Sequence, residues 1–270
     1  MARDPTGASF GSKYDDPAAI VSKQRGASRC TLQRPQKCHN TPMKTLLFLI
    51  AGTLSLQAQT GVAQVLPVVD LVYPRPDGTV FDTNCLQMSN TTLDPAAVKA
   101  AVERTPEFQQ LVNRELRPYL SLTYEEVGMP FPYREVQAAL TVCRGIHSMS
   151  SPLILNVGRY LPTAQNREPD WYFVEQAYHE LMHTYAGPAV ATSELARKYA
   201  SEDRVTLYHL HVMALEKFVL VKLNRTEELN HVGELYGQPP AYKRAWEIVD
   251  KLEDYRAFIK ELKVYAARGH

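Results

Sequence analysis

The pattern of hydrophobic and polar positions divides the chain into a leader and a domain. Residues 1–42 are polar, with neither a helical nor a strand period. An apolar run, Leu46–Leu56, follows a Met-Lys pair and precedes a series of small residues. This layout is typical of a secretory signal peptide, and the run is shorter than the roughly 20 apolar residues of a membrane-spanning helix. The alternative is a cytoplasmic tail followed by a buried apolar helix.

We therefore expect the functional start at Met43 and export of the protein to the periplasm or the medium. The predicted divisions are an upstream extension over residues 1–42, a signal peptide over 43–63 and a single domain over 64–270. No stable membrane span would then remain after signal removal.

The first half of the domain mixes two hydrophobic periods. Residues 65–83 predict a strand, a Pro-Asp-Gly turn and an extended segment. Behind an Asp-Pro cap, residues 94–128 carry apolar positions at helical spacing. The pattern favours another short helix over 133–140 and a buried strand over 151–162.

The second half is dominated by the helical period. We expect a helix over 170–187, with Asp170 as its cap and Gly187-Pro188 at its end. A short helix capped by Thr192 or Ser193 and a long helix opening near Ser201 follow. The tail from Pro239 predicts one or two amphipathic helices after a loop. The expected fold class is α+β, mainly helical, with a small sheet in the first half packed against the helix over 170–187.

One helix carries a motif with chemical meaning, His179-Glu180-Leu181-Met182-His183. Residues four apart share a helix face, so the two imidazoles offer half of a zinc site. Glu180 projects about 100° around the helix, where it can take a proton from a zinc-activated water. The alternative, a solvated helix with two surface histidines, fits poorly with the apolar residues around them.

The HELMH segment resembles the zincin metallopeptidases. This resemblance implies His179 and His183 as zinc ligands and Glu180 as the catalytic general base. It also implies an edge strand that runs beside the active-site helix and binds the substrate backbone. Residues 151–161 occupy the position expected for that strand.

The third ligand is ambiguous. No histidine directly follows the helix, so the metzincin pattern is excluded, and a gluzincin-like ligand on the downstream helix is expected. Glu202, His209 and Glu216 are spaced by seven and share one face of that helix. We favour His209, then Glu216, then Glu202, which lies in a first turn where acidic residues are common. The unused member of the His209 and Glu216 pair would orient a ligand ring.

Two nearby residues have open roles. His211 is expected to be a core histidine, with stabilisation of an oxyanion by His211 or Tyr208 as the alternative. Glu175 precedes His179 by one turn, and we expect it to form a solvated salt bridge rather than to support the metal.

Composition narrows the function. The 270-residue chain has 30 Lys and Arg against 29 Asp and Glu, a formal net charge of +1, which argues against nucleic acid as a partner. Two of the four cysteines, Cys85 and Cys143, lie after the leader, and we expect them to form either a disulfide or two buried free thiols.

The expected protein is an exported zinc peptidase acting on a peptide or protein substrate. The alternatives are a non-catalytic protein with a closed zinc site and an interaction module without metal.

Overall fold

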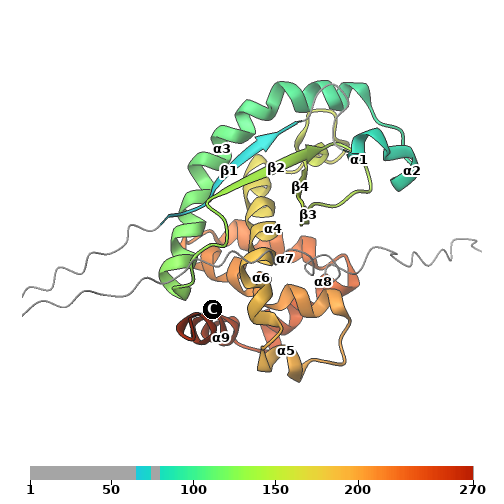
Figure 1. The fold of residues 1–270 in the computed structure, drawn as a ribbon. Coiled ribbons are helices and arrows are strands. Elements are labelled where there is room, and N and C mark those ends of the chain that lie inside the picture. The colour runs from blue at the N-terminus through green and yellow to red at the C-terminus, as the bar shows by residue number, and fades with distance from the viewer. Residues whose placement is uncertain (1–64, 74–79, 270) are drawn as a thin grey trace, which may run out of the picture. The chain divides into compact units, whose positions relative to one another are not determined.

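The computed structural model describes residues 65–73 and 80–269. This part of the chain is mainly helical and holds one small mixed sheet (Figure 1). The predicted extension over residues 1–42 and the predicted signal peptide over 43–63 lie outside the described residues. Among the described helices, none combines the length and the apolar character needed to cross a membrane.

The sheet has four strands in the order β1-β2-β4-β3. Their bounds are β1 Val68–Val72, β2 Glu135–Thr141, β3 Met149–Ser150 and β4 Leu153–Asn156. β2 pairs in parallel with β1 and with β4, and β3 is antiparallel to β4. Of the strand predicted over 151–162, only the part Leu153–Asn156 forms a strand, β4, and this strand lies inside the sheet. The edge position that the resemblance implied for it belongs to the short strand β3.

The prediction of a helix over 133–140 was wrong, because this segment forms β2. Its alanines, glutamate and glutamine favour a helix locally, but Ala138 and Leu140 are fully buried between two neighbouring strands. Pairing on both sides outweighs the modest intrinsic preference of these residues. The extended segment expected before Thr83 was also wrong, since Val80–Thr83 forms helix α1.

The other helices of the described residues pack against the sheet or against one another. They are α2 Cys85–Ser89, α3 Pro95–Val127, α4 Asp170–Val190, α5 Glu194–Lys198, α6 Arg204–Lys222, α7 Thr226–Tyr236, α8 Pro240–Glu247 and α9 Tyr255–Ala267. A 3-10 turn spans Gly158–Tyr160 and a π-helical turn spans Ile248–Leu252. The helix α7 was not predicted.

Helix caps agree with the sequence in part. The Asp94 carboxylate accepts a hydrogen bond from the Ala96 amide at the start of α3, and Ser193 caps α5 in the same way. α6 is capped by Asp203 rather than by Ser201. Asp170 is the first residue of α4, and instead of capping it pairs with Arg104 of α3 at 2.6 Å.

The predicted end of α4 at Gly187-Pro188 was wrong. Gly187 does not adopt the positive φ of a helix-terminating glycine, and the helix continues to Val190. A proline near the end of a helix removes only one of its hydrogen bonds, so the last turn can form around Pro188.

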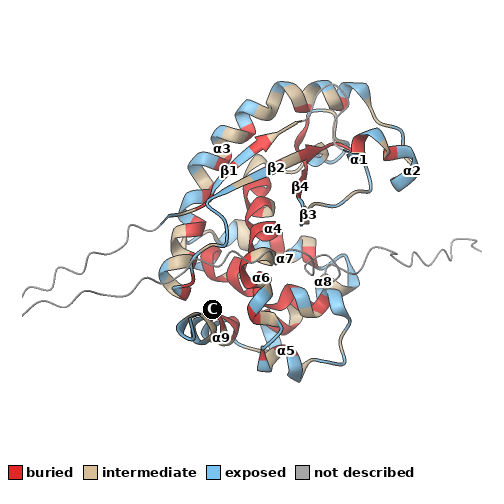
Figure 2. Cartoon of the chain, in the orientation of Figure 1, coloured by how far each residue is buried: buried red, intermediate tan, exposed pale blue. Residues whose placement is uncertain are grey.

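α4 is the central helix of the described domain. It packs against α3 and α6 and contacts β3, β4 and α9. Figure 2 shows long buried stretches along both α4 and α6. A disulfide joins Cys85 of α2 to Cys143 behind β2, which decides between the two alternatives for these cysteines. The fold thus holds two buried helices, α4 and α6, side by side, with α4 in contact with β3 and β4.

Candidate metal centre

Three histidines converge where α4 packs against α6. His179 and His183 come from successive turns of α4, and their Nε2 atoms are 3.1 Å apart. His209 enters from α6, and the three candidate ligand nitrogens all lie within 4.8 Å of one another. The three residues that the sequence favoured as ligands therefore meet at one point.

Hydrogen bonds on the other ring nitrogen orient two of these rings. His209 Nδ1 lies 2.7 Å from the carbonyl oxygen of Val205 and donates to it. His179 Nδ1 lies 2.7 Å from Glu216 Oε1 and donates to that carboxylate. Both rings then present Nε2 as a lone-pair donor to the cluster, and His209 Nε2 is buried with no hydrogen-bond partner among the described residues. A buried ring nitrogen with a free lone pair, next to two further imidazoles, fits a set of metal ligands.

The surroundings keep two of the imidazoles neutral, which is the form that binds a metal. Burial lowers the pKa of His183 to about 2, with the neighbouring histidines adding to the effect. Burial also lowers the pKa of His209 to about 3, again reinforced by His179. A buried cluster of this kind disfavours protonation and favours a shared cation.

Glu216 lies behind His179 rather than with the three Nε2 atoms. Burial raises the pKa of this fully buried carboxyl group to about 7. Tyr236 of α7 donates to the same Glu216 oxygen at 2.8 Å, and its hydroxyl lies 3.0 Å from His179 Nδ1. Glu216 and Tyr236 therefore contact the Nδ1 edge of the His179 ring, which is the position expected of Glu216 if His209 is the third ligand.

The other candidates lie elsewhere or differ from expectation. Glu202 precedes α6 and pairs with Arg244 at 2.8 Å, away from the histidines. His211 is fully buried, 3.0 Å from a carboxylate oxygen of Glu261, as expected of a core histidine. Tyr208 is exposed and stacks against Arg204.

Glu175 corrects an expectation. It was predicted to be solvated, but only 1% of its surface is exposed, and one of its oxygens lies within 4.8 Å of both His179 and Glu216. Burial, followed by the neighbouring Glu216, raises its pKa. The sequence misled here because Glu175 is a helical glutamate in the first turns of α4, where acidic residues usually face solvent.

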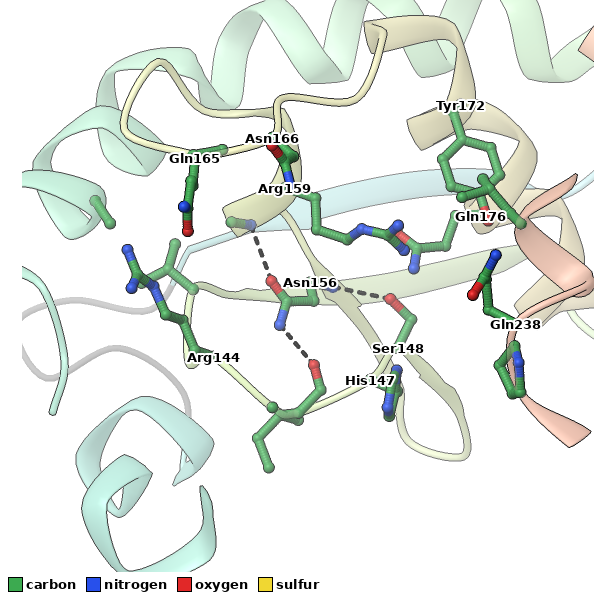
Figure 3. A pocket seen from close by; sticks show the side chains of 18 of the residues that line it. Arg144, His147, Ser148, Asn156, Arg159, Gln165, Asn166, Tyr172, Gln176 and Gln238 are labelled. Atoms are coloured by element: carbon green, nitrogen blue, oxygen red, sulfur yellow. Dashed lines mark hydrogen bonds between the residues drawn. The ribbon is translucent and has the colours of Figure 1, made fainter. Parts of the chain in front are cut away.

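A cavity of about 680 Å³ reaches the cluster at His179 and Glu180. Tyr172, Gln176 and Glu180 follow one another at intervals of four, so they line one face of α4 along the cavity. Burial raises the pKa of Glu180 to about 7, against the opposing influence of His179. Figure 3 shows the pocket, with Tyr172 and Gln176 facing Gln238 from the segment after α7.

Two tyrosines of the site were missed by the sequence analysis. Tyr236 ends α7, and Tyr242 of α8 places its ring centroid 4.2 Å from that of His209. Tyr236 lies in the segment that was predicted to be a loop, and Tyr242 lies at the start of the tail that was predicted to be helical. The signal that could have found α7 is the helical spacing of Leu229, Val232 and Tyr236 behind an acidic first turn.

The arrangement offers three imidazoles, the Glu180 carboxyl group with its raised pKa and a cavity that reaches both. No protein-family model, no curated protein and no solved structure matches the chain. What the site does must therefore be argued from its geometry and chemistry.

Proposed function

We propose that the protein is a zinc-dependent hydrolase, with a peptide or protein as substrate and with His179, His183 and His209 as the metal ligands. The observation that carries this proposal is the convergence of three ligand nitrogens within 4.8 Å, next to Glu180 and a cavity. Zinc prefers a tetrahedral set of nitrogen and sulfur ligands, and three histidines with one open position are common in catalytic sites.

When bound, zinc supplies a Lewis acid that polarises a carbonyl group and lowers the pKa of a water molecule. Glu180 faces the cavity, and its pKa of about 7 suits a group that takes a proton from the attacking water near neutral pH. The same carboxyl group can then pass the proton to the nitrogen of the leaving amine. Glu216 and Tyr236 fix the tautomer and the orientation of His179 during this cycle.

The rival function is a closed, non-catalytic zinc site in which Glu216 completes a tetrahedron. Glu216 contacts Nδ1 of His179, and the cluster with His183 forms at Nε2 on the opposite side of that ring. A carboxylate placed there supports the metal from behind a ligand and leaves the fourth position free. This arrangement favours the hydrolase.

The deciding experiment is elemental analysis of protein expressed from Met43, alongside His179→Ala, His209→Ala and Glu180→Gln. We expect close to one zinc per chain, lost in both histidine variants and retained in Glu180→Gln. Peptide hydrolysis should fall by about 100-fold or more in Glu180→Gln, the usual contribution of a general base. Absence of metal from the unmutated protein, even after zinc is supplied, would refute the proposal.

A further inference from the structure

The cavity continues beyond Glu180 into a polar, partly cationic cleft. Its far wall is the loop after β2, which contributes Arg144, His147 and Ser148. The cavity is also lined by Arg159 and by the side-chain amides of Gln165, Asn166, Gln176 and Gln238 (Figure 3). These side chains offer several N–H donors, so this part of the cleft suits a substrate with negatively charged or carbonyl oxygens.

The two arginines that line the cavity, Arg144 and Arg159, differ in their ion pairs. Arg159 pairs with Glu168 at 3.0 Å and lies over the ring of Tyr172. Arg144 is exposed to the cleft, and within residues 65–73 and 80–269 no carboxylate forms an ion pair with it. Figure 3 shows the Gln165 side chain on the same side of the pocket as the Arg144 guanidinium. Arg144 therefore offers a positive charge that can pair with a bound anion, whereas the charge of Arg159 is already paired with Glu168.

The acidic residues of the cavity do not compensate this charge locally. Glu175 and Glu180 belong to α4 beside the candidate metal ligands, and neither forms an ion pair with Arg144 in the described part of the chain. Asp94 also lines the cavity, and its carboxylate accepts from the Ala96 amide at 2.9 Å but forms no ion pair with Arg144 among the described residues.

The backbone that carries Arg144 is braced from behind. The buried Asn156 donates to the carbonyl oxygens of Cys143 at 2.9 Å and Ile146 at 2.6 Å. The backbone amide of Asn156 donates to Ser148 Oγ. The Cys85–Cys143 disulfide ties the start of the loop to α2. A loop fixed in this way presents its arginine with little further loss of entropy on binding.

We propose that this end of the cleft recognises a carboxylate of the substrate, with Arg144 as its charged partner and the nearby amides as further donors. The inference rests on the proposed hydrolase and narrows its substrates to peptides that place a carboxylate at this end of the cleft. The carboxylate is that of an Asp or Glu side chain or of the peptide C-terminus. An arginine pairs well with either, because its planar fork matches the two carboxylate oxygens.

The test uses zinc-loaded protein and four peptides of one sequence, which carry Glu or Gln at a single position and a free or amidated C-terminus. Hydrolysis and, in the Glu180→Gln background, binding are measured for unmutated protein, Arg144→Ala and Arg144→Lys. The control is Arg117→Ala, an exposed arginine of α3 that does not line the cavity. We expect a preference of roughly 10- to 100-fold for the peptide with the recognised carboxylate.

Arg144→Ala should abolish that preference, Arg144→Lys should keep part of it, and Arg117→Ala should keep all of it. The Glu against Gln pair and the free against amidated pair tell which carboxylate is bound. Cleavage without such a preference, or with the preference intact in Arg144→Ala, would overturn the inference and leave the hydrolase proposal standing. Binding that depends on Arg144 without cleavage would support the inference and refute the hydrolase. Neither binding nor cleavage of any peptide would overturn both.

Discussion

Glu216 Oε1 lies 2.7 Å from Nδ1 of His179, on the side of the ring away from His183. This contact joins α6 to α4. The hydroxyl of Tyr236 donates a hydrogen bond to the same carboxylate, which is fully buried. A histidine whose Nδ1–H is held by a carboxylate has a fixed tautomer and a more basic Nε2. In the proposed ligand set, Glu216 therefore supports the ligand His179 without being a ligand itself.

Replacing Glu216 by Gln should weaken zinc binding without abolishing it. The amide keeps a hydrogen-bond acceptor near His179 but loses the charge that makes Nε2 basic, and loss of such a partner typically lowers metal affinity roughly 10- to 100-fold. Competition with a chromogenic chelator measures this change. The exposed Glu227 of α7 provides a matched control, and Glu227→Gln should bind zinc as the unmutated protein does.

If Glu216→Gln instead lost zinc as completely as His179→Ala, Glu216 would have to be a ligand itself. His209→Ala separates the two cases, because the proposed ligand set predicts near-complete loss of zinc there. A folded far-UV spectrum of each variant excludes the trivial explanation of unfolding.

The helices that carry the candidate metal centre could be predicted, whereas the positions of two tyrosines beside it could not. The i,i+4 histidines and the seven-residue spacing of His209 and Glu216 are local periodicities of single helices. Tyr236 and Tyr242 reach the site because α7 and α8 fold back onto α6, and a turn between helices leaves no periodic signal. The position of β2 between β1 and β4 is likewise a long-range result, which explains why its helix-favouring residues were misleading.

Loss of the Cys85–Cys143 disulfide should destabilise the domain while leaving the metal bound. The bridge closes a loop with a sequence separation of 58, and restriction of the unfolded chain by a loop of this length stabilises by about 4 kcal/mol in the chain-entropy view. Thermal unfolding of protein from Met43 with and without a reductant measures the effect. The Cys85→Ser, Cys143→Ser double variant should unfold at the reduced temperature in both conditions, since no other cysteine follows Met43. Equal stability of oxidised and reduced protein would contradict the prediction.

Glu261 of α9 should make the domain sensitive to acid. Burial opposes ionisation of this carboxyl group, but hydrogen bonds from His211, Ser193 and the Leu195 amide lower its pKa to about 2. A carboxyl group whose pKa is lowered by folding stabilises the protein fully above its unfolded pKa of about 4.3, and this contribution is lost as the pH falls toward 2.

The variant Glu261→Gln should therefore be less stable than the unmutated protein at pH 7, by about 1–3 kcal/mol for a hydrogen-bonded charge. Urea unfolding at a series of pH values should show this difference shrinking between about pH 4.3 and pH 2. A difference that stayed constant across that interval would mean that the charge of Glu261 does not contribute. Glu227→Gln, at an exposed position of α7, serves as the control.

Gln109 of α3 takes the place of a neighbouring strand at the open edge of β1. Its Oε1 accepts from the Leu71 amide at 2.7 Å, and its Nε2 donates to the Val69 carbonyl at 2.9 Å. Gln109→Ala would leave both backbone groups without this partner at an edge that the helix otherwise covers, so we expect a loss of about 1–3 kcal/mol. The adjacent, exposed Gln110→Ala should change the stability by less than about 0.5 kcal/mol. Chemical denaturation of the two variants decides the matter, and equal stabilities would show that water replaces the Gln109 contacts without penalty.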